Sequence, residues 1–478
     1  MVKSARVDRV ASLIAFLGPL LAYGLTLAPD ITWAYQGADG GDLITAAYTL
    51  GVPHPSGYPT YVLLGWAISR PELGSIAWRF NAMSALFMAG AAWFTFKVVK
   101  NATGFWFAAL VAAWTFAFLP LVWSQAIITE VYGLHLFFVA LLIWLGMQIR
   151  TGRTGLAFRM GVSFGLALGA HLTVLWLLPV LVWAIWPRLR DKWLQVGLGL
   201  GLGLLIFAYL PLRAGQGAIT WGEPNTPAGF LALVSGQIYR DYLFSLPVEL
   251  LAPRLLALAG YLSQMGLLAL TLLGAGIWWA WRYARQALVW AAISAGCYAV
   301  YALGYRTADS FVYLLPIFVL AAIGVGLGAN DIIGIIPIPY RQAAIWGSLG
   351  LIIVWAGVGG VTVSLKGEQQ AATFWRTVFA QAPADAVLLT YQDNHTFTLW
   401  YAQHVLQQRP DVTIVDTGLL GYDWYITDLR RAYPWLNLPP DVADRFARAE
   451  VQPYPLCAVI KMEQPETWQL ECLIAPSN

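Results

Sequence analysis

Long apolar runs separated by short polar segments make up the first three quarters of this chain. A helix needs about 20 apolar residues to cross the roughly 30 Å hydrocarbon core of a bilayer. Residues 160–186 are too few for two full spans, so we expect two short helices that meet near His171. Together with these, the runs predict an all-α polytopic domain over residues 1–363 with about eleven membrane segments. The full-length runs are residues 10–27, 77–99, 105–123, 131–149, 193–212, 255–281, 288–303, 311–328 and 343–363.

Basic residues near the ends of the runs predict their direction. Lys3, Arg6 and Arg9 precede the first run, and further Lys and Arg residues follow the second and fourth. Because Lys and Arg are enriched in cytoplasmic loops, we expect a cytoplasmic N-terminus. A cleavable signal peptide is the alternative for the first run, but no small-residue cleavage site follows it. The predicted external segments are residues 28–76, 124–130 and 213–254 and the tail from residue 364.

The tail has a different pattern from the rest of the chain. Residues 386–391 and 412–416 are short apolar runs bounded by turn residues, and the helix-like segment 396–408 lies between them. A strand, a helix and a second strand in this order favour a parallel pair of strands. Residues 364–478 are therefore predicted to form a small extracytoplasmic α/β domain.

Composition supports a membrane protein and excludes other classes. The 478 residues are 59% hydrophobic and 11% charged, with a mean hydropathy of +0.62 and a formal net charge of only +3. No soluble core can absorb that much apolar surface, and the basic residues do not cluster with aromatic residues as a nucleic-acid groove requires. Cys457 and Cys472 share the tail, where they form a disulfide only if it faces an oxidising compartment.

The first predicted external segment contains the strongest candidate chemistry. Residues 39–42 read Asp-Gly-Gly-Asp, and His54 follows between two prolines. One ionised carboxylate can act as a base while its neighbour binds a cation or a substrate hydroxyl. The alternative is that Asp42 caps a helix that begins at Leu43, with Asp39 simply solvated. The prolines make the segment around His54 rigid, as a site on a loop requires, although a stiff turn into the next helix would look the same.

These residues resemble the prokaryotic family of protein O-mannosyltransferase-like membrane proteins, which belongs with the GT-C glycosyltransferases. The resemblance covers nearly the whole chain, and its most specific part is the first external segment. Family members usually read Asp-Ser-Gly-Glu where this chain has Asp-Gly-Gly-Asp at residues 39–42, so Asp39 matches and Asp42 is one methylene shorter. The matching stretches are residues 26–33, 39–42, 46–59, 123–125, 129–132, 209–213, 221–224, 399–401 and 409–412.

The resemblance implies a GT-C-like fold and a specific reaction. A sugar would move from a polyprenyl-phosphate donor to a hydroxyl of a protein, lipid or glycan acceptor, on the extracytoplasmic face of a prokaryotic plasma membrane. It also implies a catalytic acid in the first external segment, and we expect inversion at the anomeric carbon. A transporter of lipid or glycan is the alternative, but it predicts paired repeats and polar residues at mid-membrane. A structural or receptor-like membrane protein is a further alternative.

A mechanism follows from the residue types. We expect Asp39 to take the proton of the acceptor hydroxyl, assisted by Asp42 or Glu130. Phosphate leaves as a stable anion, so electrostatic stabilisation by an arginine should be important. Arg240 and Arg306 are the preferred phosphate ligands, with headgroup anchoring as the alternative role of each. Other predicted substrate-binding residues are His54, Tyr58, Arg79 and Asp309.

A metal ion is left open by the sequence. Mg²⁺ or Mn²⁺ could bridge Asp39, Asp42 and the donor phosphate, because these ions prefer oxygen ligands. Two carboxylates alone do not make a complete metal site.

Overall fold

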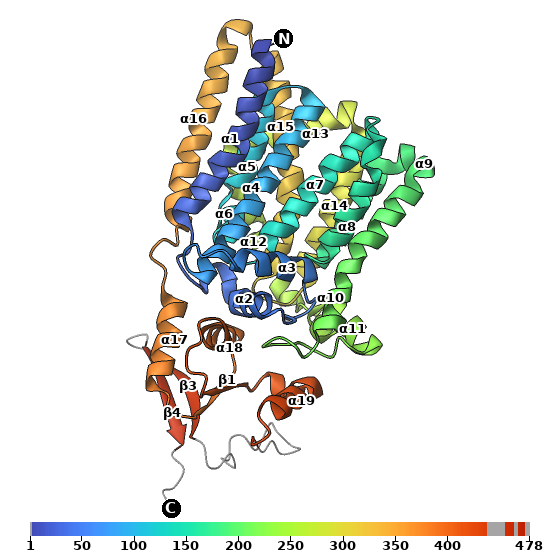
Figure 1. Cartoon of the computed structure of the whole chain (residues 1–478). Helices are drawn as coiled ribbons and strands as arrows, with labels where there is room; N and C mark the ends of the chain where they lie inside the picture. Colours follow the sequence, from blue (N-terminus) through green and yellow to red (C-terminus); the bar gives the residue numbers. More distant parts are fainter. Residues whose placement is uncertain (1, 437–454, 463–466, 474–478) are drawn as a thin grey trace, which may run out of the picture.

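A computed structural model describes residues 2–436, 455–462 and 467–473. Most of the helices form one bundle, and the tail after α16 lies beyond one end of it, opposite the N-terminus (Figure 1). The long apolar runs of the sequence form these helices, so the predicted polytopic helical fold is confirmed. The bundle helices are α1 (Val2–Thr26), α4 (Ile76–Thr103), α5 (Trp106–Ala117), α6 (Pro120–Ala126), α7 (Tyr132–Arg150), α8 (Ala157–Leu168), α9 (Leu178–Leu204), α12 (Leu251–Ser263), α13 (Gly266–Tyr283), α14 (Arg285–Gly304), α15 (Leu315–Ile335) and α16 (Ile338–Val363).

The structure has fewer membrane spans than the eleven segments predicted. Within the described residues, seven helices are long and apolar enough to cross a membrane, and nine result if α5–α6 and α12–α13 each count as one bent span. The main difference lies in α9, whose helical backbone continues through Pro187, although residues 160–186 and 193–212 were predicted as separate membrane segments. The Arg and Lys residues that follow Pro187 have a high helix propensity and lie at the protein surface, so they allow the helix to continue.

Small residues allow close contact between helices of the bundle. A Cβ on Gly276 of α13 would overlap the backbone of Gly324 on α15, and a Cβ on Gly328 would overlap Leu272. Close backbone approach of this kind is typical of helix packing in membranes, where apolar burial gives little driving force. Other helices keep apolar side chains on the outside: Leu351 and Val358 of α16 are 61% and 63% exposed. Such a surface is suited to lipid.

The tail folds into a small domain of strands and helices. Its sheet has the order β2-β1-β3-β4, in which β1 pairs in parallel with both β2 and β3, whereas β3 and β4 are antiparallel. The predicted strand, helix and parallel strand are thus confirmed. Cys457 and Cys472 lie opposite each other on β3 and β4 and form a disulfide. The elements are α17 (Gln370–Gln381), β1 (Val387–Thr390), α18 (Asp393–Trp400), β2 (Thr413–Asp416), α19 (Asp423–Ala432), β3 (Leu456–Met462) and β4 (Thr467–Leu473).

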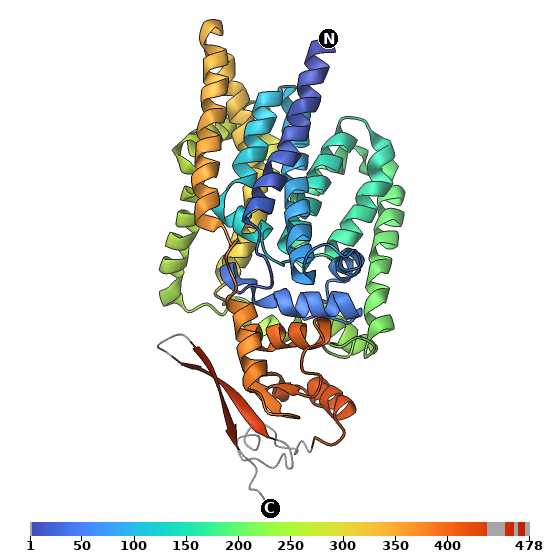
Figure 2. The same cartoon turned by 60° about the vertical axis from the view of Figure 1, so that its left-hand side comes forward.

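Four short helices lie at the end of the bundle that faces the tail. They are α2 (Gly40–Thr49), α3 (Pro59–Ser69), α10 (Tyr209–Arg213) and α11 (Pro227–Val234). Figures 1 and 2 show α2 and α3 between the bundle and α18. Every residue of α2 from Gly40 to Ala47 is buried, since the helix is covered by the bundle and by the tail. The acidic segment therefore lies where these two parts of the chain meet.

Candidate active site

Asp42 is a fully buried carboxylate with a partner at each oxygen. Its Oδ2 accepts the backbone N–H of His54 at 3.0 Å and lies 2.6 Å from Nδ1 of the same residue. Its Oδ1 accepts the indole N–H of Trp221 at 3.0 Å. The helix begins at Gly40, not at Leu43, so Asp42 lies within its first turn and does not cap it. Asp42 holds the His54 ring in one orientation.

Asp39 lies on the other side of the same imidazole. Its Oδ2 is 3.5 Å from Nε2 of His54, and its side chain is 37% exposed, compared with 9% for His54. Burial alone would lower the pKa of His54, but the carboxylates of Asp39 and Asp42 outweigh it and raise that pKa to about 9. His54 is therefore an imidazolium at neutral pH. Asp39 is the only one of the two acids that keeps an accessible carboxylate.

A cavity of about 510 Å³ opens beside this group. Its wall comes from distant parts of the chain: the first loop, the start of α7, residues 171–173, residues 235–243, the loop between α14 and α15 with the helix ends beside it, and the tail. Several tyrosines complete the wall, including Tyr239 and Tyr305. Among the residues predicted from the sequence, those on the wall are Asp39, His54, Tyr58, Arg306 and Asp309. The fold thus brings together predicted residues that are up to 270 positions apart in sequence, from Asp39 to Asp309.

Glu130 is not among the residues that line this cavity. The residue is buried, 3% exposed, and its backbone is held by the hydroxyl of Ser84. Burial raises the pKa of its carboxyl well above the usual range, and the charge of Asp39 raises it further. A carboxyl kept neutral in this way can donate a hydrogen bond, whereas Asp39 can accept one.

The three arginines predicted to bind substrate, together with Arg213 and Arg254, have different positions. Arg306 lies on the cavity wall, whereas Arg240 is exposed and lies outside it. The guanidinium of Arg79 donates to the carbonyls of residues 69, 73 and 74. Arg213 donates to the end of α2, and Arg254 donates to carbonyls and to a hydroxyl in residues 302–310. Arg254 thereby holds the loop that carries Arg306 at the cavity.

Tyr58 and His171 form an aromatic wall of the cavity. The Tyr58 hydroxyl donates to the carbonyl of Pro55 at 3.0 Å, and its ring meets His54 edge-on with centroids 5.1 Å apart. His171 stacks on Tyr58 and accepts the backbone N–H of Thr173. Burial lowers the pKa of His171 to about 4, and the nearby charge of His54 adds to this. His171 is therefore a neutral packing partner at physiological pH.

Asp393 is a site residue that the sequence reasoning missed. It begins α18 in the tail and lines the same cavity as Asp39. Burial raises its pKa to about 6, with a further contribution from the charge of Asp39. A signal was present in the sequence, because Asp393 follows the carboxyl end of the parallel strand β1, where α/β folds place their ligands.

A glycine on α2 lets the tail approach the cavity. A Cβ on Gly41 would overlap the backbone carbonyl of Phe397 on α18. We expect Gly41→Ala to destabilise the protein by about 1–3 kcal/mol, because two buried backbones must separate. Thermal unfolding of the purified protein measures this effect. Gly24→Ala on α1 is the control, since a Cβ there meets nothing within 4 Å. Equal unfolding temperatures for the two variants would contradict the close packing of α2 on α18.

The described residues offer a poor metal site. Among them, no group of three or more His, Cys, Asp or Glu side chains is arranged to hold a metal ion. The His54 ring lies between Asp39 and Asp42, where a cation that bridged the two carboxylates would have to lie. Bridging of the two carboxylates by Mg²⁺ or Mn²⁺, which the sequence left open, therefore does not fit this geometry, and we derive no step through a metal.

Sequence comparisons point to one group of proteins. Residues 39–195 match the model of the protein O-mannosyl-transferase TMEM260 N-terminal domain, and residues 371–444 match TMEM260-associated domain 2. The chain is 27% identical to protein O-mannosyl-transferase TMEM260 of Mus musculus over 467 residues, and 25% identical to that of Dictyostelium discoideum over 483. The alignments cover 90% and 86% of this chain. The chain spans only 66% and 58% of these two relatives, both eukaryotic, so its predicted prokaryotic source stays a prediction.

Solved structures agree on the fold. ArnT from Cupriavidus metallidurans matches with TM-scores of 0.57 without ligand and 0.56 bound to undecaprenyl phosphate. Each match covers 96% of this chain and more than nine tenths of ArnT, at 13–14% identity. Asp39, Asp42, His54 and Glu130 fall within the first matched domain, and Asp393 falls within the second. The chain has a GT-C-like membrane fold.

Proposed function

We propose that this chain is a membrane glycosyltransferase that moves a sugar from a polyprenyl-phosphate carrier to an acceptor hydroxyl. The observation that carries the proposal is the row Asp42–His54–Asp39, which ends in an accessible carboxylate at a cavity of about 510 Å³. The O-mannosyl-transferase relatives favour mannose as the sugar, and the ArnT structure with undecaprenyl phosphate favours a lipid phosphate donor.

The reaction assigns one task to each part of the cavity. Asp39 takes the proton of the acceptor hydroxyl as its oxygen bonds to the anomeric carbon. The bond from that carbon to the phosphate oxygen breaks, and the electron pair leaves with the lipid phosphate. Attack from the side opposite the phosphate inverts the anomeric carbon. Burial raises the pKa of Asp39, and the positive charge of His54 opposes that rise while Asp42 holds the ring.

The phosphate end of the donor needs positive charge, and Arg306 supplies it in this proposal. Asp309 follows on the same loop. Asp393 reaches the cavity from the tail, and in this proposal the acceptor enters the cavity on the side of the tail. Glu130, neutral and buried, would donate a hydrogen bond near Asp39. The tyrosines of the wall offer flat surfaces and hydroxyls to the sugar.

Removing Arg306 should weaken donor binding. We expect Arg306→Ala to raise the KM for a polyprenyl-phosphate sugar about 10- to 100-fold, because a charge-assisted contact with phosphate is lost. Steady-state kinetics on the purified protein in lipid nanodiscs measures this change. Arg240→Ala removes an arginine that lies outside the cavity and is expected to change KM less than twofold. A larger effect at Arg240 than at Arg306 would show that the donor phosphate binds elsewhere.

We further propose that the cavity faces the extracytoplasmic side. The disulfide between Cys457 and Cys472 supports this orientation, since disulfides persist in oxidising compartments. The N-terminus, at the opposite end of the bundle in Figure 1, would then be cytoplasmic. In this proposal residues 1–363 form the transmembrane domain and residues 364–478 the extracytoplasmic domain.

A direct assay tests the proposed activity. Purified protein in nanodiscs is incubated with polyprenyl-phosphate mannose, glucose or aminoarabinose and with a hydroxyl acceptor peptide, lipid or glycan. We expect release of polyprenyl phosphate and sugar transfer for at least one pair, with mannose the preferred sugar. Movement of an intact lipid-linked sugar across a vesicle membrane, without its cleavage, would instead favour a transporter.

A further inference from the structure

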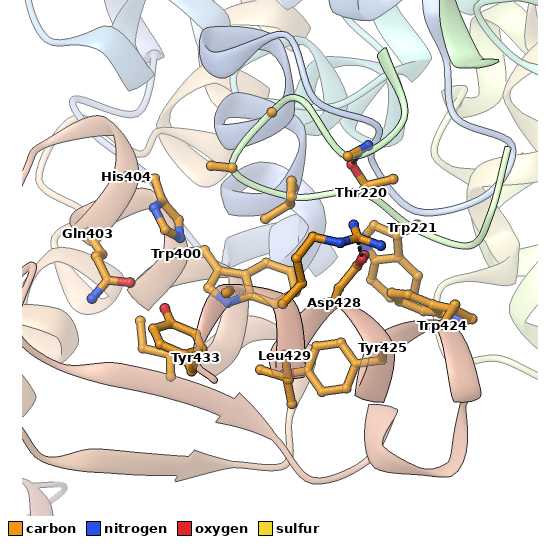
Figure 3. Close-up of a pocket in the computed structure, with 17 residues that line it drawn as sticks. Thr220, Trp221, Trp400, Gln403, His404, Trp424, Tyr425, Asp428, Leu429 and Tyr433 are labelled. Carbon is orange, nitrogen blue, oxygen red and sulfur yellow. Dashed lines mark hydrogen bonds and ion pairs between the residues drawn. The ribbon is translucent and has the colours of Figure 1, made fainter. Parts of the chain in front are cut away.

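A second cavity lies on the other side of Trp221 from the proposed catalytic site. It has a volume of about 250 Å³ and is formed by residues 215–221, which follow α10, together with α19 and the end of α18 (Figure 3). Trp221 belongs to both places: its indole N–H donates to Asp42, while its ring lies on the wall of this second cavity. Ligand pockets for drug-sized molecules measure about 300–1,000 Å³, so this cavity is the size of a smaller, single-ring group.

Aromatic rings form much of the wall. Trp221 and Trp424 lie with their centroids 5.5 Å apart and their planes tilted by 37°. Trp400 lies near the centre of the view in Figure 3, and Tyr433 lies below it. The electron-rich face of an aromatic ring attracts the weakly positive C–H groups of a sugar ring. Indole and phenol groups also keep a polar edge that can bond to hydroxyls.

The polar groups of this cavity are neutral or already paired. Gln403 donates its amide N–H groups to the carbonyls of Arg409 and Val412, so its oxygen is turned into the cavity (Figure 3). Asp428 accepts from Arg431 at 2.9 Å, which balances both charges. Such a set matches a neutral ligand with many hydroxyls better than an anion or a cation.

His404 adds a neutral donor and acceptor to this set. Its ring faces the cavity, and neither ring nitrogen is hydrogen-bonded within the described part of the chain. Burial lowers its pKa to about 4, so the ring is uncharged at physiological pH. One nitrogen can then donate to a ligand while the other accepts.

We infer that this cavity binds one sugar ring of a glycan, as a site separate from the catalytic cavity. The aromatic faces would pack against the ring, and Gln403, His404 and Tyr433 would bond to its hydroxyls. A glycan held there would lie against Trp221, the residue that positions Asp42. This inference goes beyond the proposed transfer reaction, because it concerns binding alone and holds whether or not the chain transfers a sugar.

Saturation-transfer NMR on the full chain in nanodiscs tests the inference. The probes are methyl α-D-mannopyranoside and methyl β-D-glucopyranoside at millimolar concentration, with N-acetyltyrosinamide as a peptide-like probe. We expect saturation transfer from the protein to at least one glycoside. Trp424→Ala should reduce it at least fivefold, and Tyr433→Phe, which removes only a hydroxyl, about threefold. Tyr391→Ala is the matched control, because Tyr391 is a 77% exposed tail residue outside the cavity and should leave the signal unchanged.

Three outcomes would overturn the inference. They are no saturation transfer to either glycoside, an unchanged saturation-transfer signal in both Trp424→Ala and Tyr433→Phe, or saturation transfer to N-acetyltyrosinamide alone. The last would identify the cavity as a peptide site. Thermal unfolding of each variant shows whether it is folded, and Tyr433→Phe provides the decisive comparison if Trp424→Ala does not fold. A loss of sugar transfer in the enzymatic assay, with glycoside binding intact, would contradict the proposed function only.

Discussion

Asp39→Asn is expected to lower the rate of sugar transfer by about a thousandfold while the protein remains folded. General-base catalysis contributes roughly 10²- to 10⁴-fold, and an amide cannot take a proton from the acceptor hydroxyl. The side chain is partly exposed at the cavity, so its replacement removes little packing. Initial rates with a polyprenyl-phosphate sugar in saturating amounts measure the effect.

Two comparisons make this result specific. Asp39→Glu keeps a carboxylate but moves it by one methylene, so we expect it to recover part of the activity. Asp393→Asn changes another acid of the same cavity and should have a smaller effect if Asp39 is the base. Undiminished transfer by Asp39→Asn would exclude Asp39 as the base and move attention to Asp393.

Asp42→Asn should lower transfer by about 10²- to 10³-fold through the orientation of His54. The amide group would place N–H donors or a weaker acceptor against the ring N–H, so the imidazolium loses its anionic partner. Asp416→Asn is the matched control, since Asp416 is also buried and accepts backbone N–H groups, but in the tail. Both variants should lose about 1–3 kcal/mol of stability, because each weakens hydrogen bonds to a buried carboxylate.

The pH dependence of stability and of sugar transfer distinguishes the effect of Asp42 on His54 from a general loss of stability. Its pKa in the folded protein is about 9, above the ordinary value of 6.5. The stabilisation from the imidazolium is therefore complete below about pH 6.5 and is lost as the pH rises through about 9. In Asp42→Asn, we expect the loss of stability and of transfer to begin at lower pH. An unchanged pH profile in Asp42→Asn, or the same shift in Asp416→Asn, would contradict this role.

The sequence identified many of the polar residues near the cavity, but it could not assign a role to each of them. Asp39 and Asp42 are separated by two residues, and the sequence offered both as acids of one site. The structure distinguishes them because Trp221, 179 residues away, and His54 occupy the oxygens of Asp42. The arginines are distinguished in the same way: carbonyls bind Arg79, Arg240 is exposed outside the cavity, and Arg306 lies on its wall.

The sequence by itself determined that the chain needs a membrane environment, where the apolar helices lie along the chain, and the strand–helix–strand order of the tail. These features depend on the hydrophobicity of each segment and on the spacing of its apolar residues. Both are local properties of the sequence that do not depend on contacts with distant residues. Only the tertiary structure decided the continuous course of α9, the meeting of Asp393 with the first loop, and which acid faces the cavity. Such features depend on contacts between residues far apart in sequence, because a buried polar group must find its hydrogen-bond partner wherever the fold supplies one.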